Sequence, residues 1–154
     1  MEAKMDDSNP RYQALIELLQ TADTVWNASR VFFGRWDLGP SQFNVLNLLH
    51  LNPAGLSQTD LSRQLIMHRS NLTGLVDRLE KRGLVQRQEV ATDRRAYSVV
   101  LTTAGATLLR DILPRYYEEA NGVWDHLSAR RASELISDLQ QAAQNAQRTA
   151  RSEC

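Results

Sequence analysis

The chain has 154 residues, 42% of them hydrophobic, which suits a single globular domain of residues 1–154. Its 18 basic and 18 acidic residues give a net charge of zero, which argues against strong non-specific binding to nucleic acid. No apolar run exceeds three residues, which excludes a membrane span. Residues 1–8 contain no apolar signal-peptide region, so we expect a cytoplasmic protein.

Two helices are predicted ahead of residue 56. Asn9 followed by Pro10 is a typical helix start, and apolar residues recur at helical spacing to about Trp36. Gly39 and Pro40 begin a second helix, which is broken just before residue 55. Both helices carry an apolar face that needs a partner.

A short helix and a longer one follow in close succession. Ser57 and Asp60 predict a capping box at the start of the first, which ends at 66–68. The second helix begins at about Met67 and ends at Gly83, a residue typical of a Schellman motif. Its apolar stripe, at helical spacing, consists of Leu72, Leu75, Val76 and Leu79.

Two helices joined by so short a turn indicate a helix-turn-helix, whose second helix lies in the major groove with its first residues against base edges. Arginine reads guanine, asparagine reads adenine, and serine or threonine suits either base. A solvated helix face has the same polar composition, so this pattern alone leaves both interpretations open. The candidate base-contacting residues are His68, Arg69, Ser70, Asn71 and Thr73.

Segments 84–90 and 96–102 are rich in Val, Leu, Tyr and Thr and predict a two-stranded hairpin. The connection between them contains Asp93, which can brace the loop, and ends with Arg94 and Arg95. Arginines at the tip of a hairpin beside a recognition helix can enter the neighbouring minor groove, where the potential is most negative. The hairpin is therefore a candidate wing.

The C-terminal part predicts two more helices. Thr102 can cap a long helix that Pro114 should bend, and Ser128 opens a last helix whose tail frays beyond Gln147. The outer helices carry more apolar surface than so small a core can bury, which predicts pairing with a second copy. The expected regions are dimerisation helices at 9–36 and 102–147 and a DNA-binding region at 39–103.

Charge is unevenly distributed along the chain. Between Ser57 and Thr102 there are eight basic and five acidic residues, a net of +3, and the remainder carries −3. A modest positive face favours binding that depends on a matched site and weakens with salt.

No catalytic constellation is found in the sequence. His50, His68 and His126 lie on three separate segments, without a Cys-x-x-Cys or His-x-x-x-His spacing. A Gly-rich phosphate loop and a Gly-x-Ser-x-Gly elbow are also missing. We therefore expect neither an enzyme nor a metal or other cofactor.

Three segments in this order resemble the core of the MarR (multiple antibiotic resistance regulator) family of bacterial repressors: 61–85, Asp93-Arg94-Arg95-Ala96 and Leu101-Thr102. Weaker similarity extends over residues 10–146. The resemblance implies a mainly α winged helix-turn-helix with a small β-hairpin wing, and a homodimer on a palindromic operator. It also implies wing arginines in the minor groove, with Asp93 in support, and a repressor whose affinity for double-stranded DNA falls with a ligand or oxidation. The expected phosphate contacts are Ser57, Gln58, Thr59 and Arg78.

The resemblance also implies a switch. Members that respond to oxidation carry a cysteine near the first helix, whereas this chain has only Cys154, so a small-molecule effector is expected. The family's ligand cleft lies between the dimerisation helices and the winged helix, and an aromatic acid would suit it. The candidate lining residues are Trp26, Arg30, Trp36, His50 and Tyr116, although aromatic residues at helical spacing are more often core than pocket.

Two other functions remain open from the sequence. A winged helix can serve as a protein-interaction module, and a winged helix can also bind DNA architecturally, without a specific operator. A protein-interaction module has no need for Arg94 and Arg95 at the hairpin tip. The wing therefore discriminates between these interpretations.

Overall fold

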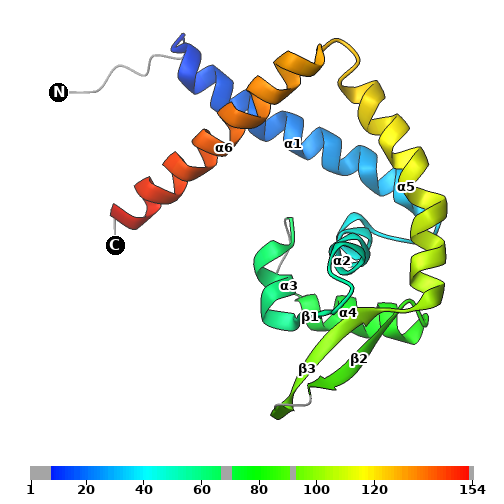
Figure 1. Cartoon of the computed structure of the whole chain (residues 1–154). Coiled ribbons are helices and arrows are strands. Elements are labelled where there is room, and N and C mark those ends of the chain that lie inside the picture. The colour runs from blue at the N-terminus through cyan, green and yellow to red at the C-terminus, as the bar shows by residue number, and fades with distance from the viewer. Residues whose placement is uncertain (1–7, 67–70, 91–92, 153–154) are drawn as a thin grey trace. The chain divides into compact units, whose positions relative to one another are not determined.

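The computed structural model describes residues 8–66, 71–90 and 93–152 (Figure 1). The mainly α fold class with a small antiparallel sheet is confirmed. The chain forms two compact units, residues 1–109 and 110–154. The elements are α1 (Pro10–Gly34), α2 (Pro40–Leu51), β1 (Leu56–Ser57), α3 (Gln58–Gln64), α4 (Leu72–Lys81), β2 (Val85–Val90), β3 (Asp93–Leu101), α5 (Thr103–Val123) and α6 (Ala129–Ser152).

The sheet has three strands in the order β1-β3-β2, all antiparallel, rather than the predicted two. Leu56 pairs with Val99, so the two residues of β1 extend the hairpin on its β3 side. Gly55 makes this possible: its φ is +87°, and a Cβ there would lie 2.8 Å from the Val99 carbonyl oxygen. The two residues of β1 were not predicted from the sequence, because they are too few to show the alternation of a strand.

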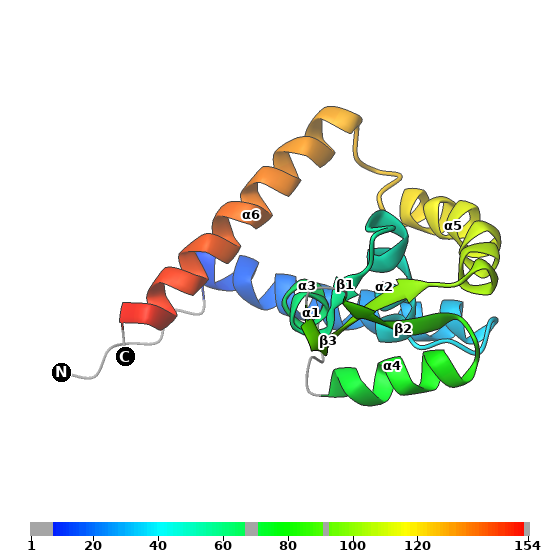
Figure 2. The same cartoon turned by 60° about the horizontal axis from the view of Figure 1, so that its bottom comes forward.

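The core of the first unit is built on α2, which contacts α1, α3, α4 and β3. The predicted stripe of α4 is confirmed, since each of its four residues is buried. Figure 2 shows α4 lying alongside β2, and the two elements are in contact. The largest fully buried side chains of this unit are Phe33, Leu46, Leu49, Leu61, Leu79 and Leu109.

The helix ends follow the local signals in the sequence. Asn9 caps α1 by accepting the Arg11 N–H at 3.0 Å, and Thr102 Oγ1 accepts the Gly105 N–H at 3.1 Å ahead of α5. Ser128 caps α6 with a 3.3 Å bond from the Arg131 N–H. The prediction of fraying beyond residue 147 is wrong, because α6 continues to Ser152.

Among the described residues, several large apolar side chains are exposed. On α1, Leu19 is 59% exposed, and on α6, Ile136 is 56% exposed. Neither helix is a membrane span: among the described residues, no helix is both long and apolar enough to cross a bilayer. The open apolar faces of α1 and α6 therefore require another explanation.

Candidate nucleic-acid interface

The first helix of the pair, α3, is closed at its start by Ser57. The Ser57 hydroxyl oxygen accepts the Asp60 N–H at 3.0 Å, and the same hydroxyl donates to Asp60 Oδ2 at 2.6 Å. Asp60 therefore binds the side chain of Ser57, not its backbone N–H as in a full capping box. The Ser57 hydroxyl thus already accepts one hydrogen bond and donates another. The hydroxyl is therefore poorly placed to make the predicted phosphate contact.

A hydrogen bond between two residues that the sequence predicts to contact DNA joins α3 to α4. Thr73 Oγ1, near the start of α4, donates to Gln58 Oε1, at the start of α3, at 3.4 Å. Thr73 is a candidate base contact and Gln58 is a candidate phosphate contact. Their hydrogen bond places the two side chains next to each other. Thr73 is exposed and Gln58 is partly exposed, so both can be reached from solvent.

The start of α4 differs from the prediction. The helix begins at Leu72 rather than near Met67, with Asn71 as its N-cap. Asn71 Oδ1 accepts the Gly74 N–H at 3.2 Å, and a Cβ at Gly74 would lie 2.5 Å from that oxygen. Asparagine is among the best N-cap residues, so the sequence itself carries a local signal for this helix start.

This cap changes what Asn71 can offer a base. Bidentate reading of adenine requires both the amide oxygen and the amide nitrogen. The oxygen of Asn71 already accepts a helix N–H, so the nitrogen is the group left for a base edge. The other candidates at this end, His68, Arg69 and Ser70, lie outside the described residues.

The C-terminal end of α4 is a Schellman motif, as predicted. Leu84 N–H donates to the Leu79 carbonyl at 3.0 Å, and Gly83 N–H donates to the Glu80 carbonyl at 2.8 Å. Gly83 has a φ of +70°, which favours glycine. The two ends of α4 are thus both determined by local hydrogen bonds.

The hairpin is longer than predicted. The backbone of Asp93, Arg94 and Arg95 belongs to β3, and Val90 pairs with Asp93, with an irregular register between Glu89 and Val90. Placing these three residues in the connecting loop was therefore wrong, because the shift lets pairing continue toward the tip. Their side chains lie outside the described part of the chain, so their predicted contacts stay predictions.

An ion-pair cluster joins the hairpin to α4. Arg87 on β2 donates through Nη2 to Asp77 Oδ1 at 2.5 Å and through Nη1 to Glu80 Oε2. The backbone N–H of Arg87 also donates to Glu80 Oε1 at 2.9 Å. The side-chain hydrogen bond with Asp77 is the main cause that raises the pKa of Arg87. This cluster was not predicted from the sequence, although Asp77 and Glu80 are three residues apart and share one face of the helix.

A second arginine holds the other end of α4. Arg82 Nη2 donates to the Trp36 carbonyl at 3.1 Å, and Arg82 Nη1 donates to the Asp37 carbonyl at 2.5 Å. This ties α4 to the turn between α1 and α2, where Asp37 has a φ of +53°. The ring of Trp36 packs against Phe32, with centroids 5.3 Å apart.

A hollow of about 310 Å³ lies between α1, α2 and α4. Trp26 and Arg30, two predicted cleft residues, line it together with Arg78, a predicted phosphate contact. Trp36 and His50 are not part of its wall, and Tyr116 belongs to the second unit. Two guanidinium groups and the N-terminal turn of α2, residues 40–42, make its surroundings favourable to an anion.

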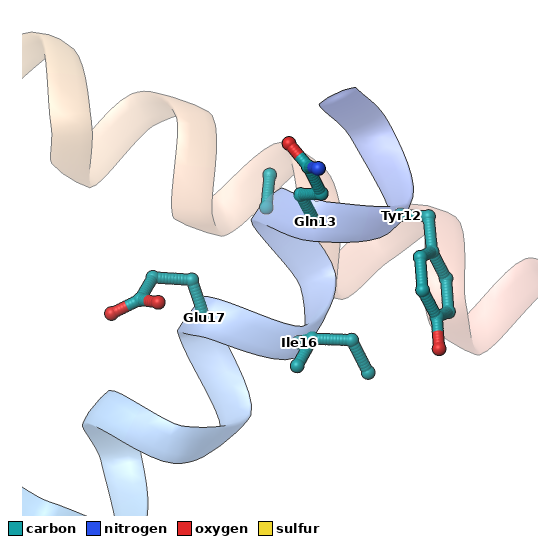
Figure 3. Close-up of a pocket in the computed structure, with 5 residues that line it drawn as sticks. Tyr12, Gln13, Ile16 and Glu17 are labelled. Atoms are coloured by element: carbon teal, nitrogen blue, oxygen red, sulfur yellow. The ribbon is translucent and has the colours of Figure 1, made fainter. Parts of the chain in front are cut away.

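A larger and more open hollow, of about 540 Å³, borders the first turns of α1 (Figure 3). Tyr12 and Ile16 lie on one side of the helix, and Gln13 and Glu17 lie on another. Its lining mixes apolar and polar side chains, and Tyr12 is exposed. Among the described residues, no three His, Cys, Asp or Glu side chains come together as metal ligands would.

The model of the MarR family matches residues 36–96. The transcriptional regulator YfiV of Bacillus subtilis is 36% identical over 107 residues, which cover 70% of this chain and 61% of that protein. The repressor MprA of Escherichia coli K12 is 35% identical over 80 residues, 52% of this chain and 46% of that protein. The chain thus spans about half to three fifths of the length of these relatives.

Solved structures share the fold over nearly the whole chain. AbsC, a MarR family transcriptional regulator from Streptomyces coelicolor, has a TM-score of 0.82 at 20% identity, covering 95% of this chain and 99% of that one. MepR of S. aureus in complex with DNA has a TM-score of 0.74 at 21% identity, covering 87% and 97%. NadR in complex with 4-hydroxyphenylacetate has a TM-score of 0.70 at 27% identity, covering 93% and 96%.

Proposed function

We propose that this chain is a DNA-binding transcriptional regulator of the MarR family, a homodimeric repressor that a small-molecule ligand releases from a palindromic operator. The observation that carries the proposal is the assembly of α3, α4 and the β2–β3 hairpin on one buried core. That assembly presents a polar helix face beside a hairpin that bears two arginines. The DNA complex of MepR, which has the same fold, supports duplex DNA as the partner.

The open apolar faces support the dimer. Exposed leucines on α1 and an exposed isoleucine on α6 are costly in a monomer, because buried apolar surface contributes about 25 cal/mol per Å². We propose that residues 9–36 and 102–147 pair with a second copy, while 39–103 binds DNA. A two-fold axis would then relate the recognition helices of the two subunits. Recognition helices about 34 to 36 Å apart would fit successive major grooves of the DNA.

The hollow beside α4 supports the ligand. An aromatic acid would stack on Trp26 and pair its carboxylate with Arg30, next to the recognition helix. NadR, a neighbour of the same fold, binds 4-hydroxyphenylacetate, an acid of this kind. Of the five cleft residues predicted from the sequence, Trp26 and Arg30 are those we retain for this hollow.

Footprinting on the DNA upstream of the chain's own gene tests the regulator. We expect a protected palindrome whose affinity falls steeply with salt, and we expect Arg69→Ala to cost about 1 to 3 kcal/mol at one base pair of each half-site. Arg94→Ala and Arg95→Ala should relax A·T preference beside the half-sites. Uniform binding without a footprint would indicate an architectural protein instead, and no DNA binding at all would favour a protein-interaction module.

A titration with aromatic acids tests the switch. We expect 4-hydroxyphenylacetate or a related acid to quench Trp26 fluorescence and to weaken operator binding in the wild type. Arg30→Gln should abolish both effects while leaving operator affinity without ligand unchanged. If neither fluorescence nor operator affinity responds across a panel of such acids, the ligand part of the proposal is wrong.

A further inference from the structure

The ion-pair cluster between β2 and α4 links the two parts of the molecule that the proposed function brings to DNA. We propose that Arg87 is a positioning residue that clamps the wing onto the recognition helix, so that the two meet DNA as one rigid body. The inference rests on the proposed function for its DNA readout, but the clamp itself is a property of the free protein.

The geometry suits a clamp rather than a simple pair of charges. Asp77 and Glu80 are three residues apart on α4 and therefore lie on one face of the helix. The planar fork of Arg87 donates to both carboxylates, and its own backbone N–H donates to Glu80 as well. Three donors from one strand residue fix both distance and orientation. Lysine, a point charge on a flexible stem, would not reproduce this arrangement.

The position of Arg87 in the hairpin allows the clamp to restrict the hairpin tip. Arg87 pairs with Val99, a fully buried residue at the base of the hairpin. The register becomes irregular two residues further on, between Glu89 and Val90, and the strands then lead to Asp93 and Arg94. Two-stranded ribbons are more strongly twisted than larger sheets. A bond to α4 just before the irregularity thus limits the swing of the tip.

The charge of Arg87 is already committed. Its side chain is 22% exposed and bound to two carboxylates, so it is poorly placed to grip a phosphate itself. Removing its side chain would also leave the negative charges of Asp77 and Glu80 without their cation near DNA, and their repulsion would weaken binding without any movement of the wing. The test must therefore separate positioning from repulsion.

A double-mutant cycle on the footprinted operator makes that separation. In the wild-type background, Arg95→Ala should weaken binding by about tenfold, the value of one charge-assisted hydrogen bond. In an Arg87→Ala background, Arg95→Ala should weaken binding by less than about twofold. The reason is that in a wing not fixed to α4, the contact of Arg95 with DNA contributes little to affinity. Gln88→Ala, an exposed neighbour on β2, is the matched control and should leave the full effect of Arg95→Ala intact.

Neutralising the carboxylates tests repulsion directly. We expect Arg87→Ala/Asp77→Asn/Glu80→Gln to remain as insensitive to Arg95→Ala as Arg87→Ala alone. Restoration of the full Arg95 effect in the triple variant would overturn the clamp and assign the loss to charge. Additive effects of Arg87→Ala and Arg95→Ala would overturn it equally. Arg87→Lys, which keeps the charge, should fall between the wild type and Arg87→Ala, and serves if the alanine variant does not fold.

Hydrogen exchange on the free protein distinguishes failure of the clamp from failure of the proposed function. Amides of β2 and β3 beyond Arg87 should exchange at least about tenfold faster in Arg87→Lys, while amides of the buried α4 stripe stay protected. Unchanged exchange in the hairpin would overturn the clamp, whatever the protein binds. Faster exchange in a protein that binds no DNA would retain the clamp and refute the repressor.

Discussion

Helices α4 and α6 carry apolar stripes with the same helical spacing, yet their surroundings differ completely. In α4 no stripe residue is more than 8% exposed, whereas in α6 Ile136 and Leu139 are 56% and 37% exposed. The stripe of α4 is buried within the chain, in the core built on α2 and the sheet. Helical periodicity therefore predicts which face is apolar, but it does not say whether the cover comes from the same chain or from a second copy.

The largest expected effect comes from the buried stripe. Leu79→Ala, at a fully buried position, should lower the free energy of unfolding by about 2 to 5 kcal/mol through lost burial and a cavity. The matched variant is Leu139→Ala on α6. Urea denaturation at two protein concentrations should show a smaller loss for Leu139→Ala, and that loss should depend on concentration. Equal losses, independent of concentration, would remove the contrast between the two helices.

The next effect concerns the open faces. Leu19→Arg should shift the protein from dimer to monomer, with a loss of about 2 to 4 kcal/mol of association free energy if the residue lies at the centre of the interface. Sedimentation equilibrium measures the shift, and hydrogen exchange should show that α4 stays protected. Gln20→Arg, on the neighbouring exposed position of α1, is the control and should remain dimeric. A Leu19→Arg protein that is still a dimer would place the interface elsewhere.

A smaller effect is expected at the C-terminal end of α4. Gly83→Ala should cost about 1 to 2 kcal/mol, because alanine disfavours the left-handed φ of +70° although a Cβ there would meet open space. Gly34→Ala, which also meets nothing within 4 Å but has no positive φ, should be neutral or slightly stabilising. Thermal unfolding of both variants gives the comparison. If Gly83→Ala and Gly34→Ala change the unfolding temperature equally, the left-handed glycine of the Schellman motif does not contribute to stability.

The smallest effect separates a cap from a base contact. Asn71→Ala should cost about 1 kcal/mol of stability by removing the N-cap oxygen of α4. Asn71→Asp keeps that oxygen and should be as stable as the wild type, yet it should bind the operator more weakly because it loses the amide donor and adds a negative charge. Calorimetry and operator titration on the same samples distinguish the two roles. An aspartate variant with wild-type operator affinity would remove Asn71 from the base contacts.

Several elements could be predicted from the sequence because their causes are local. The Asn9 cap, the Schellman end at Gly83 and the Thr102 cap all depend on residues within a few positions of one another. The start of α4 was predicted too early, although Asn71 carried the signal. The loop boundary in the hairpin was wrong because strand pairing, not local composition, places Asp93 in β3.

By itself, the sequence determined the helix periods, their caps and stops, and the order of a helix pair followed by a hairpin, since these depend on neighbours along the chain. Tertiary structure alone decided the partners of groups far apart in sequence. It paired β1 with β3, brought Trp26, Arg30 and Arg78 around one hollow, and joined Arg87 to Asp77 and Glu80. The physical reason is that a charge or a two-residue strand has no period, so only the folded core can select its partner.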